Sequence, residues 1–345
     1  MHRMLEIGRK ATVAAVFAAV AGLGGTSGAQ ALEKVSFGTN WLAQAEHGGF
    51  YQAVADGTYA ACGLDVSIVP GGPQVNNRAL LLAGKLDFHM GGNMLQVFYA
   101  KREDIPVVVV SALFQKEPQV ILTHPGKYPS WEAMAGKAPL LIGDNGFASY
   151  YQWMISEFGF TVEQRRPYTF NPAPFLADPS AGQQGYATAE PYAIQKASGV
   201  MPDVFLIADH GFSTYATTIE TMASTVENRK DVVQCFVDGS ALGWYTYLYG
   251  DNSAANKLIQ EANPEMAAEQ IAFSVERMKE YGIVDSGDSL TLGIGAMTDG
   301  RNADFYAKMV RAGVVEEGLD ITSTYTLEFV NKGVGLDLKK KLTGK

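Results

Sequence analysis

The first unit of the chain is predicted to consist of a strand, a loop and a helix. It begins with alternating hydrophobic and polar residues. Val35 and Phe37 alternate with polar neighbours before Gly38, and this spacing predicts a strand. From Gly48 onward, hydrophobic residues recur at helical spacing, which predicts a helix that ends at Gly63. The loop between the two elements is polar and aromatic. Loops in this position are common binding sites for small molecules in α/β proteins.

The same alternation of strands and helices continues to residue 112. Strands are predicted at residues 65–69, 86–90 and 106–110, and helices at residues 75–83 and 94–102. The third of these strands is continuously hydrophobic, as expected of a strand that is buried on both faces. Repeated strand–helix–strand units with short loops predict a mostly parallel sheet, whose ligands bind beyond the carboxyl ends of the strands.

A second group of strands and helices is predicted between residues 114 and 210. Its strands are expected at residues 120–123, 140–142, 168–171, 185–189 and 204–208, and its helices at residues 148–158 and from Glu190 onward. We expect the remainder to be helical, mainly at residues 231–249, 253–261, 266–281 and 302–312. The sequence thus predicts an α/β fold with a first lobe of residues 32–113 and 211–345, and a second lobe of residues 114–210.

The first 31 residues have the pattern of a signal peptide. A basic start is followed by an apolar run, Ala11 to Leu23, which is too short to span a bilayer. Small residues at Ala29 and Ala31 predict cleavage after Ala31 and a periplasmic location. The alternative for this segment is a membrane anchor.

Charge limits the partners of the mature chain. Removing three basic residues and one acidic residue with the signal peptide leaves 24 basic and 35 acidic residues, a net charge of −11. An acidic chain without a basic run is not expected to bind nucleic acid or an anionic membrane.

The two cysteines, Cys62 and Cys235, lie 173 positions apart, each in a predicted helix. A disulfide is compatible with an oxidising compartment. The alternative is two small buried side chains, and it is favoured because nothing in the sequence brings the two helices together.

No motif of a known catalytic or metal site is present. The chain lacks HExxH, CxxC, a P-loop and a nucleophile elbow, and the histidines after the signal peptide have no metal-ligand spacing. We therefore expect a binding protein, not an enzyme, with no catalytic residue, no metal and no cofactor.

The candidate ligand-binding residues are side chains near the ends of predicted strands and helices. The aromatic candidates can stack on a flat ring and are Trp41, Tyr51, Tyr150, Tyr192 and Tyr215. The polar candidates can bind the edge of that ring and are Asn40, His47, Asn93 with its neighbour Gly92, Asn145 and Ser149. The alternative for Trp41 is a core position at the end of a strand.

Glu190 is the acidic candidate. It stands between a predicted strand and a helix that begins with Pro191, where a carboxylate can accept from an amine or a protonated ring nitrogen. The alternative is a structural charge that is stabilised by the helix dipole. No loop concentrates arginine, which argues against a phosphate or sulfonate ligand.

Several segments together resemble bacterial substrate-binding proteins of ABC importers, in the branch similar to the thiamine-pyrimidine synthase superfamily. The segments are FGTNWLAQAEHGGFYQA, GGPQVN, LDFHMGGN, GYATAEPYAI, and GWYTYLYGD with the following EANPEM. The resemblance covers about residues 33–335. It implies a type II periplasmic binding protein fold of two α/β lobes, joined by two hinge crossings near residues 114–116 and 209–211, with the ligand between the lobes.

The resemblance also implies a function. A monomeric periplasmic protein would bind a pyrimidine precursor of thiamine and deliver it to an ABC permease in the inner membrane. Relatives bind sulfonates, nitrate or riboflavin, so these ligands remain alternatives, as does a secreted pyrimidine-processing enzyme. Fungal synthase members carry a cysteine-rich iron-binding motif that this chain lacks, so their enzymatic role is not carried over.

Overall fold

The computed structural model describes residues 31–73 and 75–345. Apart from Ala31, the predicted signal peptide lies outside the described residues. None of the described helices is both long and apolar enough to cross a membrane.

The first sheet has five strands in the order β2-β1-β3-β10-β4. β1 pairs in parallel with β2 and with β3, whereas β10 is antiparallel to both β3 and β4. The sheet is therefore mixed, although a mostly parallel sheet was expected. Its strands are β1 (Glu33–Gly38), β2 (Leu64–Val69), β3 (Phe88–Asn93), β4 (Val107–Phe114) and β10 (Ala216–Met222).

Strand β10 corrects the expectation that the chain is helical after residue 211. The segment ATTIETM is rich in threonine, which has a high propensity for strands, but it shows no hydrophobic period because most of it is buried. Its Glu220 is fully buried and is compensated by Arg78 at 3.3 Å and by His89 at 3.2 Å. These partners lie more than 130 residues away in the sequence, so the local pattern does not reveal them.

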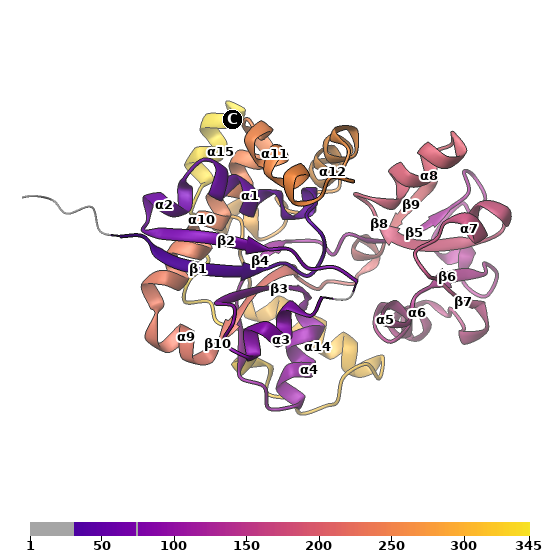
Figure 1. The fold of residues 1–345 in the computed structure, drawn as a ribbon. Coiled ribbons are helices and arrows are strands. Elements are labelled where there is room, and N and C mark those ends of the chain that lie inside the picture. Colours follow the sequence, from indigo (N-terminus) through magenta and orange to yellow (C-terminus); the bar gives the residue numbers. More distant parts are fainter. Residues whose placement is uncertain (1–30, 74) are drawn as a thin grey trace, which may run out of the picture. The chain divides into compact units, whose positions relative to one another are not determined.

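Helices cover the two faces of the first sheet (Figure 1). One side carries α1 (Gly48–Ala55), α2 (Thr58–Ala61), α10 (Lys230–Tyr249), α11 (Ser253–Ala262) and α15 (Leu336–Thr343). The other side carries α3 (Asn77–Leu82), α4 (Met94–Arg102) and α14 (Asp299–Arg311). The expected helix from Gly48 to Gly63 is divided, because Gly57 adopts φ 75° between α1 and α2.

Two glycines allow α1 to approach α10 closely. A Cβ atom on Gly48 would lie 2.1 Å from the ring of Tyr247, and one on Gly49 would lie 2.2 Å from the ring of Trp244. Only glycine fits at these positions without a shift of the two helices. This contact fixes the start of α1, and with it the loop that precedes α1.

The second sheet has five strands in the order β7-β6-β8-β5-β9, and β5 is antiparallel to β8 and β9. The strand expected at residues 168–171 is wrong, because β7 ends at Pro167 and a loop follows. The strands are β5 (Gln119–Thr123), β6 (Leu140–Ile142), β7 (Arg165–Pro167), β8 (Gly182–Tyr186) and β9 (Asp203–Leu206). The helices are α5 (Asp144–Phe147), α6 (Tyr150–Phe158), α7 (Ala173–Ala177) and α8 (Glu190–Ser198).

We call the first sheet with its helices the first lobe, and the second sheet with its helices the second lobe. The first lobe also contains α9 (Ala223–Asn228), α12 (Ala268–Glu280) and α13 (Ser289–Leu292). Short 3-10 helices are η1 (Ala45–His47), η2 (Glu132–Met134), η3 (Val162–Gln164), η4 (Ile207–His210) and η5 (Ile321–Thr324). The two-lobed α/β fold with two crossings confirms the predicted fold class.

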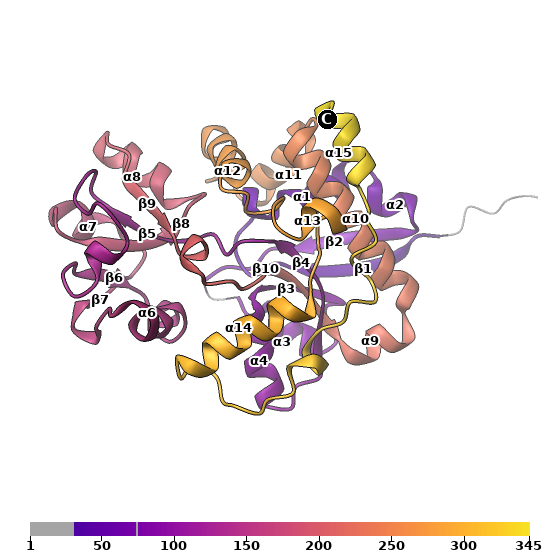
Figure 2. The same ribbon diagram turned by 180° about the vertical axis from the view of Figure 1, so that it is seen from behind.

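The chain crosses between the lobes twice, from β4 to β5 and from η4 to β10 (Figure 2). The side chains of Lys116 and Asp209 join the two crossings through an ion pair of 2.6 Å. Arg301 donates to the carbonyl oxygens of Gln115 on one crossing and of Ser213 on the other. The two crossings are thus held side by side, as expected if they form a single hinge.

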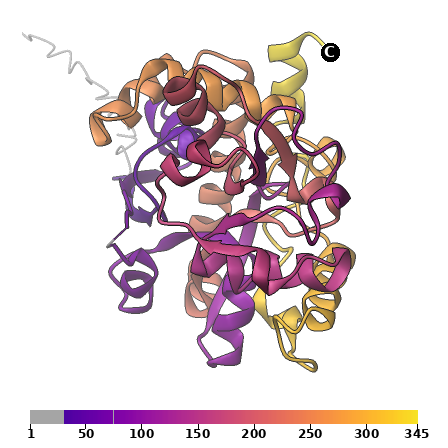
Figure 3. The ribbon, with the colours of Figure 1, turned by 90° about the vertical axis from the view of Figure 1, so that its right-hand side faces the viewer.

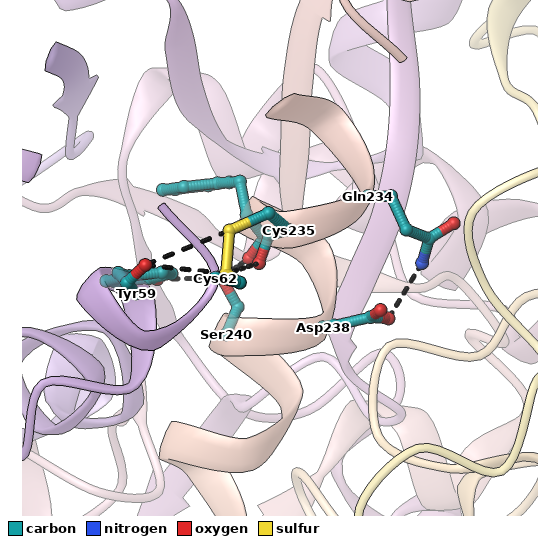
Figure 4. Close-up of a disulfide and its surroundings, with 7 residues drawn as sticks. Tyr59, Cys62, Gln234, Cys235, Asp238 and Ser240 are labelled. Carbon is teal, nitrogen blue, oxygen red and sulfur yellow. Dashed lines mark hydrogen bonds between the residues drawn. A yellow bond between two sulfur atoms is a disulfide. The ribbon is translucent and has the colours of Figure 1, made fainter. Parts of the chain in front are cut away.

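Cys62 and Cys235 form a disulfide, with 5.8 Å between their Cα atoms (Figure 4). The favoured alternative of two separate buried thiols is therefore wrong. The bond joins the end of α2 to α10, next to the hydrogen bond between Tyr59 and Ser240. It thereby ties the start of the first lobe to its long helix.

Candidate functional site

A cavity of about 550 Å³ is lined by residues of both lobes. Figure 3 views the molecule from the side of the second lobe, with the first lobe behind it. The first lobe contributes Asn40, Trp41, Leu42, Gln44, Glu46, His47, Met90, Gly92, Phe114, Ala216, Thr217, Asn263, Glu265, Met266 and Gln270. The second lobe and the first crossing contribute Pro118, Gln119, Tyr168, Phe170, Pro172, Gln183, Gln184, Gly185, Tyr186, Ala189, Glu190, Ala193 and Ile194.

Two exposed aromatic side chains face each other from opposite lobes. Trp41 is 36 % exposed and Phe170 is 69 % exposed, and the centroids of their rings lie 6.3 Å apart. The backbone of Trp41 is fixed, because its carbonyl oxygen accepts from the amide of Gly71 and from the hydroxyl of Thr39. The core alternative for Trp41 is therefore wrong. A pair of this kind can bracket a flat ring.

Backbone strain also gathers at the cavity. Phe170 has φ 61° and Thr217 has φ 47°, and the side chains of both residues line the cavity. A left-handed backbone is unfavourable for a bulky or β-branched residue and costs about 1–2 kcal/mol. Such strain is enriched at ligand sites, where the surrounding structure holds a side chain in place.

The charged side chains of the cavity are acidic. Among the described lining residues, Glu46, Glu190 and Glu265 carry carboxyl groups, and there is no lysine or arginine. Burial raises the pKa of Glu46 to about 7, and burial also raises the pKa of Glu190. A buried carboxylate without a basic partner is unfavourable, and a cationic group of a ligand would relieve that cost.

Glu190 has a structural contact as well as a position in the cavity. It begins α8, and its Oε2 accepts from the backbone amide of Tyr186 at 2.6 Å. Glu190 therefore also has a structural role, which was the alternative predicted for it. Because a carboxylate accepts several hydrogen bonds, this contact leaves capacity for a ligand.

Several buried polar side chains near the start of α1 have no hydrogen-bond partner among the described residues. Both ring nitrogens of His47 lack a hydrogen-bond partner among the described residues, as do the hydroxyl of Tyr247 and Nε1 of Trp244. Burial lowers the pKa of His47 to about 3, so the imidazole is neutral and offers one donor and one acceptor. His47 is among the residues that line the cavity, although both of its ring nitrogens are shielded from solvent.

Five of the twelve predicted site residues line the cavity, namely Asn40, Trp41, His47, Gly92 and Glu190. Three of the predicted tyrosines are instead buried in the core. Tyr51 packs within the core on α1, and the hydroxyl of Tyr215 donates to Asp288. The hydroxyl of Tyr150 donates to Gln184, a lining residue, so Tyr150 positions the cavity wall without forming it.

The other four predicted residues also lie outside the lining of the cavity and have structural contacts. Asn93 caps α4 and donates to Glu117, and it does not line the cavity. Asn145 is exposed on α5, and the hydroxyl of Ser149 donates to its carbonyl oxygen. The ring of Tyr192 packs at 5.6 Å from Phe273 of α12, outside the cavity.

Several lining residues were not predicted from the sequence. Glu46 lies in the loop between the first predicted strand and helix. Its charge among small and polar residues just before a helix could have marked it as a candidate site residue. Phe170 was placed in a strand that does not exist. Asn263 follows the helix expected at residues 253–261, and its side chain donates to the carbonyl oxygen of Ala43 and holds the loop of Trp41. In the described part of the chain, no three His, Cys, Asp or Glu side chains gather in an arrangement that could hold a metal ion.

Solved structures show which class of fold this is. The aliphatic sulphonate binding protein SsuA of Escherichia coli is 15 % identical with a TM-score of 0.58, over 85 % of this chain and 91 % of that one. SsuA of Xanthomonas axonopodis pv. citri, solved with MOPS, is 11 % identical with a TM-score of 0.57, over 86 % and 99 %. The desulfurization enzyme DSZB is 11 % identical with a TM-score of 0.56, over 88 % and 99 %. The chain thus has the periplasmic binding protein fold.

The sequence gives a narrower assignment. The family model described as NMT1/THI5 like matches residues 44–253. The chain belongs to the NMT1/THI5-like family. No curated protein matches the chain significantly.

Proposed function

We propose that the chain is the periplasmic solute-binding component of an ABC importer. The ligand is a small, flat, amine-bearing heterocycle, such as a pyrimidine precursor of thiamine, and the partner is a permease in the inner membrane. The lobes, divided near residues 114 and 210, close on the ligand by a hinge motion at the two crossings. The mature chain begins after Ala31 and acts as a monomer.

The observation that carries this proposal is the lining of the cavity. Trp41 and Phe170 offer two ring faces from opposite lobes, and Glu46 and Glu190 offer acceptors without a basic side chain to compete for them. An aminopyrimidine has a flat ring for the first pair and N–H donors for the second pair. Contacts to both lobes would let such a ligand stabilise the closed arrangement.

Sulfonate binding is the second candidate, because two of the proteins with this fold are sulfonate-binding proteins by name. The charge of the cavity opposes it. A sulfonate would bring a negative charge next to Glu46 and Glu190, with no lysine or arginine among the described lining residues. In a partly dry cavity such a charge is poorly compensated.

A pyrimidine-processing enzyme is the third candidate, since the desulfurization enzyme DSZB shares the fold. Product analysis separates the two classes of protein. A binding protein returns the added pyrimidine unchanged after prolonged incubation, whereas an enzyme converts it.

Substitution of Glu190 by glutamine tests the proposed ligand class. Glu190→Gln keeps an acceptor for the amide of Tyr186 and removes the charge, so it isolates the electrostatic effect. We expect titration calorimetry to show an aminopyrimidine bound about ten- to a hundredfold more weakly, since a charged hydrogen bond contributes about 1.5–3 kcal/mol.

Glu163→Gln provides the control, because Glu163 is exposed and lies outside the cavity. This variant should bind as tightly as the unaltered protein. Equal affinity of Glu190→Gln and the unaltered protein for the aminopyrimidine would reject the proposed role of Glu190.

A further inference from the structure

Glu46 is a buried acidic residue that contacts both lobes. It lies on η1 of the first lobe, directly after the loop of Trp41, and it lines the cavity. Its Oε1 accepts a hydrogen bond from the hydroxyl of Thr188, which belongs to the second lobe. The side chains of Glu46 and Thr188 are both buried, so this bond is shielded from solvent.

Thr188 is held from a second side by the first lobe. Its carbonyl oxygen lies 2.7 Å from Oγ of Ser274 on α12, which is also buried. The hydroxyl of Ser274 also lies 2.8 Å from the carbonyl oxygen of Gln270, so it donates to the carbonyl oxygen of either Thr188 or Gln270 at any one time. The turn between β8 and α8 is thus clamped by two side chains of the opposite lobe.

The same turn carries the other acidic residue of the cavity. Glu190 follows Thr188 by two residues, and its charge acts on Glu46. A change at Glu46 therefore affects the contact between the lobes and the charge of the cavity together.

We propose that Glu46 selects a ligand with a positively charged group and, through Thr188, couples that charge to the closed arrangement of the lobes. The proposal rests on the proposed function, because it takes the cavity as the ligand site. A cation near Glu46 favours the carboxylate, and the proton of Glu46 leaves to solvent. The carboxylate is the stronger acceptor for the Thr188 hydroxyl, since charge-assisted hydrogen bonds are roughly twice as strong as neutral ones.

The groups that surround Glu46 determine the direction of its pH dependence. Besides Glu190, they are the hydroxyls of Tyr186 and Tyr247, which stay protonated because burial raises their pKa values, and the neutral imidazole of His47. Burial of Glu46 itself raises its pKa to about 7. The ionised fraction of Glu46 therefore falls about tenfold between pH 8 and pH 6, and affinity for a cation should fall with it.

Two pyrimidines that differ in one group test the charge selection. 4-Amino-5-aminomethyl-2-methylpyrimidine carries an ammonium group at pH 7, and its 5-hydroxymethyl counterpart does not. We expect the first probe to bind at least tenfold more tightly than the second. Glu46→Gln should abolish this preference, and it should also abolish the roughly tenfold loss of affinity between pH 8 and pH 6 that is due to Glu46. The control Glu269→Gln, at an exposed position on α12, should change neither. An unchanged preference in Glu46→Gln would overturn the proposal.

A distance measurement tests the coupling without any ligand. Spin labels at the exposed positions Lys196 of α8 and Lys257 of α11 report the separation of the lobes, because the native cysteines are paired. Thr188→Val keeps the shape of the side chain and removes the hydroxyl. We expect the variant to show longer distances than the unaltered protein and to bind both pyrimidines several-fold more weakly. It should also retain only part of the ammonium preference, because the coupling through Thr188 contributes to that preference.

The two hypotheses can fail separately. If neither pyrimidine binds but Thr188→Val lengthens the distance, the proposed ligand is wrong and the contact between the lobes stands. If the pyrimidines bind and Thr188→Val changes neither distance nor affinity, the proposed function stands and the coupling through Thr188 is rejected. If neither pyrimidine binds and the distance is also unchanged, both are rejected.

Discussion

Phe170 should contribute to ligand binding although its backbone conformation is strained. Its ring lies 6.3 Å from the ring of Trp41 across the cavity and 5.4 Å from that of Tyr168 in its own loop. Its backbone adopts φ 61°, a conformation that favours glycine. Most of the side chain is exposed, so little packing stabilises a phenylalanine at this position. Substitution by glycine removes the ring and relieves the strain in one step.

The expected change in stability is a balance of three small effects. A left-handed backbone costs a non-glycine residue about 1–2 kcal/mol, which Phe170→Gly regains. Glycine costs about 0.5–1 kcal/mol through the entropy of the unfolded chain. About a third of a phenylalanine ring is covered here, and its loss costs about 0.5–1 kcal/mol. The free energy of unfolding should therefore change by less than about 1 kcal/mol.

The expected change in affinity is larger. Loss of one stacked ring should weaken an aminopyrimidine by about 1–2 kcal/mol, or about five- to thirtyfold. Phe170→Ala removes the same ring and keeps the strain, so it should lose the same affinity and be less stable than the glycine variant by about 1 kcal/mol.

Urea denaturation and titration calorimetry on both variants decide the matter. Val162→Ala is the control, because Val162 is an exposed apolar residue of the second lobe outside the cavity. An alanine variant that is as stable as the glycine variant would refute the strain. Unchanged affinity in both variants would refute the role of the ring.

Two further predictions concern stability. Replacing both Cys62 and Cys235 by alanine should lower the free energy of unfolding by about 2–5 kcal/mol in urea denaturation, because the bond closes a loop of 173 positions; an unchanged midpoint would contradict this. Gly49→Ala should destabilise the protein by about 1–3 kcal/mol because the new Cβ atom would meet the ring of Trp244, whereas Gly300→Ala, in open space on α14, should stabilise it by about 0.5–1 kcal/mol. A thermal scan that places both glycine variants on the same side of the unaltered protein would reject the packing argument.

Local patterns in the sequence predicted the first strand and the loop that follows it. The alternation around Val35 and Phe37 predicted β1, and the loop after it supplied Asn40, Trp41 and His47 to the cavity. These residues could be found because a loop after a strand has a known place in an α/β sheet. The two lobes followed from the same reasoning.

The missed features depend on partners that are distant in the sequence. Strand β10 contains Glu220, which is buried only because Arg78 and His89 compensate it. Tyr215 was predicted to bind the ligand, but its hydroxyl is satisfied by Asp288, 73 residues later. The importance of Glu46 depends on Thr188, 142 residues away.

A preference of the cavity for an amine-bearing ring over an anion underlies the proposed function. Titration calorimetry at pH 7 with 4-amino-5-aminomethyl-2-methylpyrimidine and with an aliphatic sulfonate tests this preference directly on the unaltered protein. Because Glu46 and Glu190 line the cavity without a lysine or arginine among the described lining residues, we expect the pyrimidine to bind at least tenfold more tightly. Tighter binding of the sulfonate would contradict the proposed function and favour the sulfonate-binding alternative.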